Sequence, residues 1–224
     1  DATPAMNRYL GAHSSLGPTL AKIPYLVAPD PANRPVITDA KLQEAMATLD
    51  TKPVAELAAQ VALAVEAADF GRFRGAKGFA FSGTTPLGAV VLGDGGDQTY
   101  RPSDANLTGN ILFLLDTGGN DTYLAPVGAN LYPAPIAVAV DLGGDDRYAY
   151  EEVPDPNDGK RLPSDGYGRY VPTAGWGPFT LSRTPRQGAG LVGVGLLFDL
   201  GAGADKYRSL RHSQGFGAFG VGVL

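Results

Sequence analysis

Four turns of this chain combine aspartate, glycine and tyrosine in the same order. Laid over one another, the four turns share an apolar run, an aspartate, a glycine-rich segment, a second aspartate and a tyrosine. The second aspartate recurs after 24, 25 and 59 residues, at Asp97, Asp121, Asp146 and Asp205. The tyrosines are Tyr100, Tyr123, Tyr148 and Tyr207. Carboxylates that recur in phase are suited to bind a hard cation or to cap turns.

The first chemical expectation is a bound calcium ion. Neighbouring strands lie about 4.8 Å apart, where two like charges repel by roughly 1 kcal/mol in water and roughly 3 to 4 kcal/mol at an effective dielectric constant of about 20. Calcium prefers six to eight oxygen ligands and would offset this repulsion. The candidate ligands are Asp94, Asp97, Asp116, Asn120, Asp121, Asp141, Asp145, Asp146, Asp199 and Asp205.

Turn capping is the alternative role for the same aspartates. An aspartate in a turn often accepts hydrogen bonds from nearby backbone amides and needs no metal. The in-phase tyrosines are expected to stack as a ladder inside or along the fold. A ladder that faces a carbohydrate ligand is the alternative for these rings.

The turns resemble those of bacterial-type β-solenoid repeat proteins with Asp-x-Gly-Gly-x-Asp-x-Tyr turns. They also distantly resemble the glycine- and aspartate-rich calcium repeats of repeats-in-toxin proteins. The period differs and the nonapeptide itself is absent, so this second resemblance covers the turns alone. It implies calcium as a cofactor and a secreted, periplasmic or cell-surface location.

Signals for catalysis are few. The chain contains no P-loop, no G-x-S-x-G elbow and no H-E-x-x-H motif. His212 precedes Ser213, but adjacent strand residues point to opposite faces, so the two do not form a catalytic pair. A polysaccharide lyase or hydrolase on a parallel β-helix is the enzymatic alternative. Its basic residues would be Arg101, Arg147, Lys206, Arg208 and Arg211.

The repeats predict a mainly β fold, a parallel β-helix or β-solenoid. Apolar runs over 111–115, 136–140 and 194–198 precede three of the turns and read as strands. A second element, Gln-Gly-x-Gly, begins at Gln187 and again 27 residues later at Gln214. Periods of 22 to 27 residues indicate one stacked unit per repeat. Helical repeats are excluded because interior glycines would cost about 1 kcal/mol each.

Side chains on both faces of these strands are apolar. Residues one, three and five before the first aspartate, such as Leu115, Phe113 and Ile111, are expected to point into the solenoid. Residues two and four before it, such as Leu114 and Leu112, then face outward. Because a half-solvated strand alternates with polar residues, we expect the outer face to be covered by helices, the insertion or a partner.

Two regions are expected. Residues 1–72 form an extended and helical N-terminal cap, with helices after Thr38 and after Asp50 or Thr51. The second helix would bury a stripe formed by Val54, Leu57, Val61 and Val65. Residues 73–224 form the solenoid, with an irregular insertion at 150–187 that carries Trp176.

Composition bounds the function. The chain has 224 residues, a net charge of -5, 31 Gly and no Cys. The missing Cys excludes disulfides and thiol chemistry, and the acidic balance argues against nucleic-acid binding. No apolar stretch is long enough to span a membrane.

The last residues match the middle of a repeat, so we expect another chain, or the rest of a precursor, to continue the solenoid. We therefore expect a structural or binding module, with carbohydrate as a further candidate partner.

Overall fold

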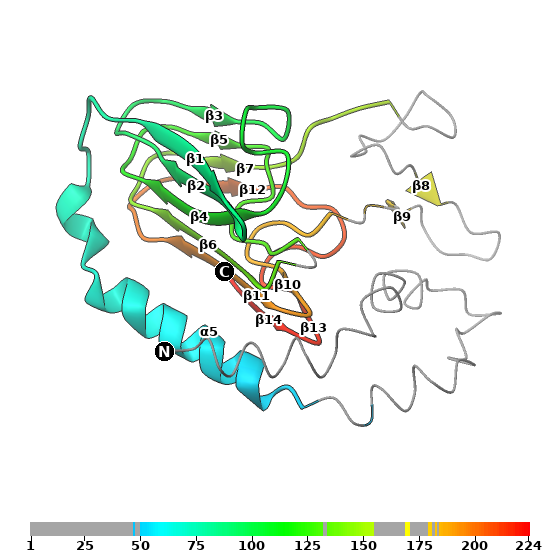
Figure 1. The fold of residues 1–224 in the computed structure, drawn as a ribbon. Helices are drawn as coiled ribbons and strands as arrows, with labels where there is room; N and C mark the ends of the chain where they lie inside the picture. The colour runs from blue at the N-terminus through cyan, green and yellow to red at the C-terminus, as the bar shows by residue number, and fades with distance from the viewer. Residues whose placement is uncertain are drawn as a thin grey trace.

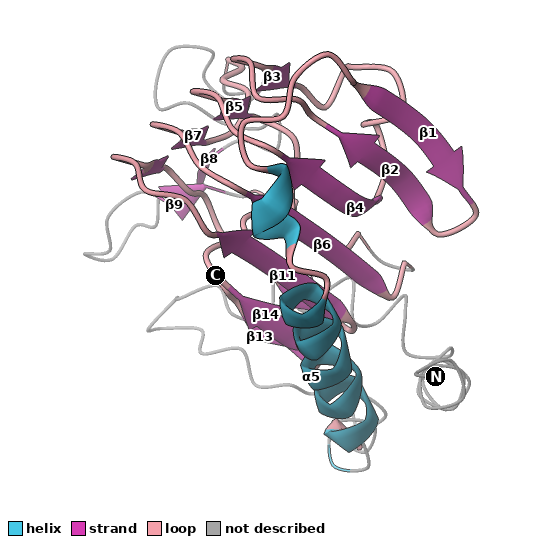
Figure 2. Ribbon diagram, turned by 90° about the vertical axis from the view of Figure 1, so that its left-hand side faces the viewer, coloured by secondary structure: helices cyan, strands magenta, loops and turns pink. Residues whose placement is uncertain are grey.

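The computed structural model describes residues 47, 50–131, 134–154, 169–170, 179–180, 182 and 184–224. These residues form a mainly β structure with one α-helix, and most of its strands pair in parallel. A sheet of longer strands and a sheet of short strands are joined by tight turns, and the helix packs beside the longer strands (Figure 1, Figure 2). The helix expected after Thr38 lies outside the described residues, apart from Ala47.

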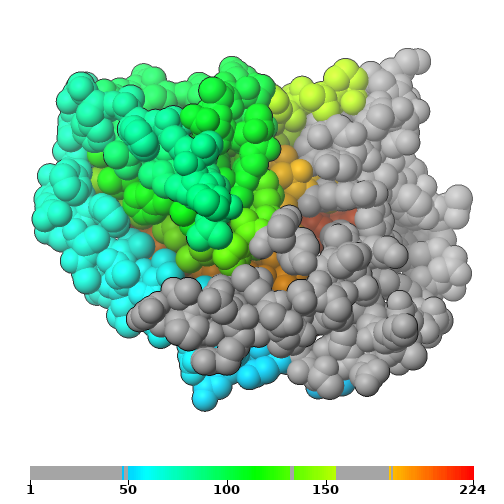
Figure 3. All heavy atoms as spheres, in the orientation of Figure 1, coloured from blue at the N-terminus to red at the C-terminus, as the bar shows by residue number. Residues whose placement is uncertain are grey.

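The longer strands form a six-stranded sheet in the order β1-β2-β4-β6-β11-β14. β1 and β2 form an antiparallel hairpin, and all other neighbours in this sheet are parallel. β1 is largely exposed and lies on the face seen in Figure 3, in green. The strands are β1 (Phe81–Thr85), β2 (Gly88–Leu92), β4 (Ile111–Asp116), β6 (Ile136–Asp141), β11 (Val194–Asp199) and β14 (Val221–Val223).

The shorter strands form three further sheets. The four-stranded sheet, in the order β12-β7-β5-β3, is parallel throughout. Its strands are β3 (Thr99–Tyr100), β5 (Thr122–Tyr123), β7 (Arg147–Tyr148) and β12 (Lys206–Tyr207). The remaining pairs are the parallel β10 (Gly190–Leu191) and β13 (Gly217–Ala218), and the antiparallel β8 (Arg169–Tyr170) and β9 (Phe179–Thr180).

Each aspartate turn connects one longer strand to one short strand. We call these units rungs: rung 1 is β2 to β3, rung 2 is β4 to β5, rung 3 is β6 to β7, and rung 4 is β11 to β12. The rungs stack in register at both ends of the turn. Asp116, Asp141 and Asp199 are aligned across the longer strands, and the four tyrosines are aligned across the short strands.

The register corrects the expected alignment of the first turn. Thr99 pairs with Thr122, so the residue opposite Asp121 is Gln98 and not Asp97. Asp97 instead matches Asn120, one position earlier in the turn. The sequence alignment was wrong because it matched carboxylates, whereas the distance to the tyrosine sets the register. The true spacing to Asp121 is 23 residues.

The expected direction of the strand side chains is wrong for residues one and three before the first aspartate, whereas Ile111, five before it, packs with the tyrosines as expected. Residues one and three before the first aspartate, such as Leu115, Val138 and Val140, belong to the core shared with the helix. Residues two before it, such as Leu114 and Ala139, pack instead with the tyrosines between the two sheets. Side chains alternate between the two faces of a strand, so the sequence showed which residues share a face. Because both faces are apolar, it did not show which of them meets the helix.

Helix α5 (Lys52–Ala67) covers one face of the six-stranded sheet. It begins after Thr51, where the Asp50 carboxylate accepts a hydrogen bond from the Lys52 amide at 3.0 Å. The predicted stripe is confirmed, since Val54 and Leu57 are buried against the strands and the stripe's remaining valines pack beside them. The 3-10 helix η2 (Phe70–Phe73) follows and places Phe70 against Phe113, with ring centroids 5.7 Å apart.

Glycines in the turns allow the rungs to approach closely. Gly119 and Gly144 have φ values of 127° and 151°, which L side chains rarely adopt. A Cβ on Gly144 would lie 1.5 Å from the carbonyl oxygen of Gly119, and one on Gly119 would lie 2.3 Å from that of Gly96. The Gly-Gly pairs of the motif are therefore a condition of stacking.

Candidate functional site

The aspartates lie in three columns that run from rung to rung. The strand-end column closes the longer strands and contains Asp116, Asp141 and Asp199. The inner turn column precedes the short strands and contains Asp121, Asp146 and Asp205. The outer turn column lies one residue earlier and contains Asp97, Asn120 and Asp145. Members of the outer turn column are exposed, whereas the first two members of each of the other columns are buried.

The tyrosines form a continuous stack beside the strand-end column, as predicted. Successive ring centroids lie 5.1, 4.6 and 4.7 Å apart, with interplanar angles of 6°, 9° and 2°. The hydroxyls of Tyr123 and Tyr148 both donate to Oδ2 of Asp141, at 2.6 and 2.9 Å. Tyr100 donates to Asp116 and Tyr207 to Asp199. The stack therefore anchors its hydroxyls on carboxylates inside the fold.

Rung 1 has Gly93 where the other rungs have the strand-end aspartate. A Cβ on Gly93 would lie 2.0 Å from the Tyr100 hydroxyl oxygen and 2.5 Å from Asp116 Oδ2. The glycine makes room for the Tyr100 hydroxyl to reach the carboxylate of rung 2. Tyr123 likewise reaches the next rung, so that Asp141 receives two hydroxyls.

Several carboxylates cap their own turns. Oδ1 of Asp116 accepts the Gly118 amide at 3.0 Å, and Oδ1 of Asp141 accepts the Gly143 amide at 2.8 Å. Asp94 accepts the amide of Gly96 in the same way, at 3.1 Å. Turn capping, one of the two roles expected for these residues, is therefore present in the turns of rungs 1 to 3.

The two turn columns bond between rungs, and they do so in opposite directions. In the inner turn column, the Oδ1 atom of each aspartate accepts a hydrogen bond from a backbone amide of the preceding rung. The amide of Gln98 donates to Asp121 at 2.6 Å, that of Asp121 to Asp146 at 2.6 Å, and that of Asp146 to Asp205 at 2.9 Å.

In the outer turn column, the Oδ1 atom of each residue accepts a hydrogen bond from a backbone amide of the following rung. The amide of Asn120 donates to Asp97 at 2.8 Å, that of Asp145 to Asn120 at 2.9 Å, and that of Ala204 to Asp145 at 2.9 Å.

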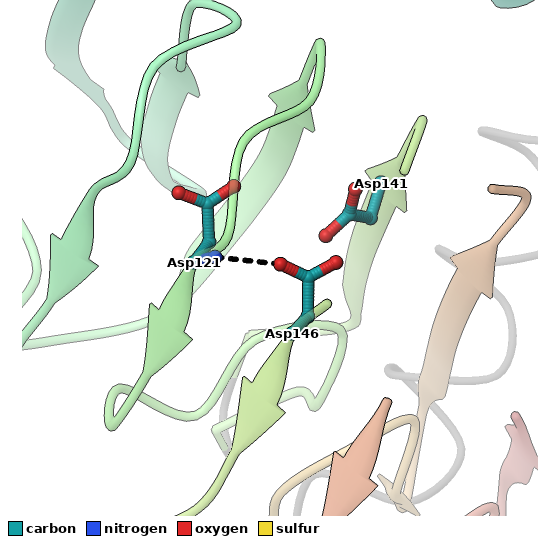
Figure 4. Close-up of side chains that lie close together, drawn as sticks. All are labelled: Asp121, Asp141 and Asp146. Atoms are coloured by element: carbon teal, nitrogen blue, oxygen red, sulfur yellow. Dashed lines mark hydrogen bonds between the residues drawn. The ribbon is translucent and has the colours of Figure 1, made fainter. Parts of the chain in front are cut away.

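Three of the ten candidate ligands meet at one point. Asp121, Asp141 and Asp146 each offer an oxygen, and these atoms lie within 4.8 Å of one another. All three side chains are 1% exposed. The Oδ2 atoms of Asp121 and Asp146 are buried and have no hydrogen-bond partner. Figure 4 shows one oxygen of Asp146 bonded to the Asp121 amide and the other directed at the Asp141 carboxylate.

The electrostatics of this cluster disfavour negative charge. Burial raises the pKa of Asp121 to about 8 and that of Asp146 to about 7, and neighbouring carboxylates add to both shifts. Burial also raises the pKa of Asp116 to about 6. None of the ion pairs between described residues includes one of these carboxylates. The cluster thus requires protons or a cation to neutralise it.

The other candidate ligands are not brought into this cluster. Asp94 accepts hydrogen bonds from the Gly78 amide and the Gln98 side chain. Asp199 and Asp205 are partly exposed at the rung 4 end of their columns, and burial raises the pKa of Asp199. The exposed members of the outer turn column hold neighbouring rungs through backbone amides.

The candidate catalytic residues do not converge with the carboxylates. Burial lowers the pKa of His212 to about 4, and its Nδ1 atom has no hydrogen-bond partner. Arg147 and Lys206 are exposed, while Arg101 and Arg208 form exposed ion pairs with Glu151 and Glu152. Most of the insertion at 150–187, including Trp176, lies outside the described residues.

Two asparagines with a comparable bridging role were missed by the sequence analysis. Asn110 donates to the carbonyls of Leu87 and Ile136 and accepts the Leu131 amide. Asn130, which is fully buried, bonds both the carbonyl and the amide of Leu191. Each asparagine joins segments of successive rungs at the end opposite the aspartate turns. A signal for Asn130 was present, since Gly128-Ala129-Asn130-Leu131 matches Gly188-Ala189-Gly190-Leu191 of the second repeated element at all positions but one.

The described part of the chain includes no helix with both the length and the apolar character needed to cross a membrane. The tyrosine rings of rungs 1 to 3 are buried, so carbohydrate contact would have to involve other residues. No family model, no curated protein and no solved structure matches the chain.

Proposed function

We propose that this protein is a β-solenoid that serves as a non-catalytic structural or binding module. One observation carries the proposal: rungs 2 to 4 align residue by residue, rung 1 joins them after a register shift at Ala89/Val90, and every inner and outer turn position of the four rungs bonds to a neighbouring rung. Repeat proteins of this kind gain their stability from interfaces between neighbouring units. Here the carboxylates that could serve chemistry are used to join those units.

The enzymatic alternative would require two carboxylates and a basic residue that converge in an open groove. In the described residues, the clustered carboxylates of Asp121, Asp141 and Asp146 are 1% exposed, and Asp141 has a donor on both oxygens. The exposed Arg147 and Lys206 lie in the short strands, one residue after the inner turn column. This arrangement supports a scaffold.

We propose that the sheet edge formed by β14 is the binding surface. Among the described residues, β14 pairs with β11 alone, and Val223 and Leu224 are 39% and 48% exposed. An unpaired parallel edge offers backbone groups to an added strand. We propose a partner that continues the rungs there, either another chain or a further segment of the same precursor. The resemblance of the turns supports a secreted, periplasmic or surface location.

Removal of one whole rung tests the scaffold. Phe113 pairs with Val138, so a deletion of residues 113–137 joins Leu112 to Val138 in register. We expect this variant to refold cooperatively with a β-type circular dichroism spectrum and reduced stability. Removal of residues 113–138 shifts the strand by one position and reverses the two faces, so this control is expected not to fold.

Failure of both deletions, or equal success of both, would contradict the solenoid. A polysaccharide panel tests the alternative function with the intact protein. We expect no release of reducing ends or unsaturated products. Release that is lost in Asp141→Asn would favour the enzyme instead, because that variant removes a charge from the carboxylate cluster.

A further inference from the structure

We propose that Asp121, Asp141 and Asp146 bind one calcium ion inside the fold, between rungs 2 and 3. Their oxygens lie within 4.8 Å of one another, so a point central to the three lies at most about 2.8 Å from each. Calcium–oxygen distances are about 2.3 to 2.6 Å, so a small inward shift of the side chains lets one ion contact all three groups. The proposal goes beyond the scaffold role, because it assigns a ligand to three named side chains.

A second observation points to a ligand at this place. Asp121 and Asp146 each use Oδ1 for a backbone amide and leave Oδ2 buried with no partner. Buried polar atoms in native proteins almost always have a partner, and an unpaired buried charge is costly. Figure 4 shows these carboxylates and that of Asp141 around a common space. A cation there would satisfy both free oxygens.

The chemistry of the donors selects calcium. All three ligands are hard carboxylate oxygens, whereas zinc commonly takes nitrogen and sulfur ligands as well. Magnesium demands strict octahedral geometry and keeps several waters, which suits exposed sites. The ligands here are 1% exposed, and calcium tolerates irregular geometry with several carboxylates.

Among the described rungs, three buried aspartates meet only between rungs 2 and 3. One rung earlier, the equivalent residues are Gln98, Asp116 and Asp121, so one carboxylate is replaced by an amide. One rung later they are Asp146, Asp199 and Asp205, of which two are partly exposed. The site proposed here differs from a repeat that binds metal in every turn.

Asparagine variants separate metal binding from the backbone hydrogen bonds. Asn120 already occupies the outer turn column and accepts an amide through its Oδ1 atom. Asp121→Asn and Asp146→Asn should likewise keep their rung-to-rung bonds while each removes one charged ligand. Asp145→Asn is the matched control, since Asp145 makes the same kind of bond from the exposed column.

Thermal melting after chelation and with added calcium is the first test. For the wild type and Asp145→Asn, calcium at about a hundredfold excess over Kd should raise Tm by about 5 to 10 °C. Asp121→Asn and Asp146→Asn should bind calcium at least about tenfold more weakly. Both should also melt at a higher temperature than the wild type in chelator, because they remove unpaired buried charge.

Terbium, a luminescent ion used in place of calcium, gives a readout independent of stability. The hydroxyls of Tyr123 and Tyr148 lie 2.6 and 2.9 Å from Asp141 Oδ2, so excitation of tyrosine should sensitise bound terbium. Added calcium should displace the bound terbium and abolish its emission. The emission should also be lost in Asp146→Asn but not in Asp145→Asn.

A wild type that shows no calcium response in either assay would overturn the site. A calcium response of wild-type size in both Asp121→Asn and Asp146→Asn would overturn it too, because the ion would then bind elsewhere. Either result leaves the rung-deletion experiment unaffected, so the calcium site and the scaffold can fail separately.

Discussion

Asn120 and Asp121 are adjacent in the chain, yet their backbone amides donate to opposite rungs. The Asn120 amide donates to Asp97 of rung 1 at 2.8 Å, and the Asp121 amide donates to Asp146 of rung 3 at 2.6 Å. Rung 2 is thereby held from both sides by two consecutive residues. Rung 3 repeats the arrangement through Asp145 and Asp146.

The inner turn column makes a prediction about Asp146. In chelator, Asp146→Ala should be less stable than Asp146→Asn by about 1 to 3 kcal/mol, because alanine leaves the Asp121 amide without an acceptor. Both variants are neutral at this position, so their difference isolates the hydrogen bond. Urea denaturation measures it. Equal stability of the two variants would mean that the bond contributes nothing.

The tyrosine stack makes a prediction about Asp141. Tyr123→Phe and Tyr148→Phe each remove one hydroxyl donor from Oδ2 and should each cost about 1.5 to 3 kcal/mol in the free energy of unfolding. The double variant should cost more than the sum, because Oδ2 is then buried with neither tyrosine donor. A double-mutant cycle by chemical denaturation measures the coupling. Strict additivity would show that the two hydroxyls act independently.

Gly93→Ala should destabilise the protein by about 1 to 3 kcal/mol or more through overpacking, because its Cβ would lie 2.0 Å from the Tyr100 hydroxyl. Gly109→Ala is the control, since a Cβ there has nothing within 4 Å. Thermal melting of both variants in the same buffer tests this. Equal melting temperatures would contradict the proposed role of Gly93 in admitting Tyr100 to rung 2.

Helix α5 carries leucines in two different environments. Leu57 is 6% exposed in the core shared with the six-stranded sheet, and Leu63 is 63% exposed. Leu57→Ala should cost about 2 to 5 kcal/mol, whereas Leu63→Ala should change stability by less than about 0.5 kcal/mol. Denaturant unfolding of the two variants checks this difference. Similar losses would indicate that α5 does not pack on the sheet in this orientation.

His212 predicts a specific pH dependence. Burial lowers the pKa of His212 to about 4 in the folded protein, so the unfolded chain takes up the proton first as the pH falls. The wild type should therefore lose stability relative to His212→Asn between about pH 6.5 and pH 4. His212 has a φ of 57°, which asparagine tolerates. Parallel pH profiles for the two proteins would refute the prediction.

The strands and turns could be predicted because their signals are local and repeated. Runs over 111–115, 136–140 and 194–198 became β4, β6 and β11, each extended by its terminal aspartate. The helix that begins at Lys52 followed from the start expected after Asp50 or Thr51 and from its apolar stripe. These features depend on propensity and period, which a single sequence displays.

The faces and the first register could not be read in the same way. Leu115 and Leu114 are equally apolar, so only contact with α5 or with the tyrosines distinguishes their directions. Gln98 hides the inner turn column in rung 1 because it lacks a carboxylate, although its distance from Tyr100 matches that of Asp121 from Tyr123. The meeting of Asp121 with Asp141 depends on stacking between rungs, which no single repeat contains.

Hydrogen-bond scalar couplings in the NMR spectrum test the stacking of the rungs most directly. We predict couplings from the amide nitrogen of Asp121 to Cγ of Asp146, and from that of Asn120 to Cγ of Asp97. Such a pair of couplings in opposite directions requires the observed register of rungs 1, 2 and 3. Couplings confined to residues of the same turn, or an Asp121 amide that couples to Asp97, would contradict it.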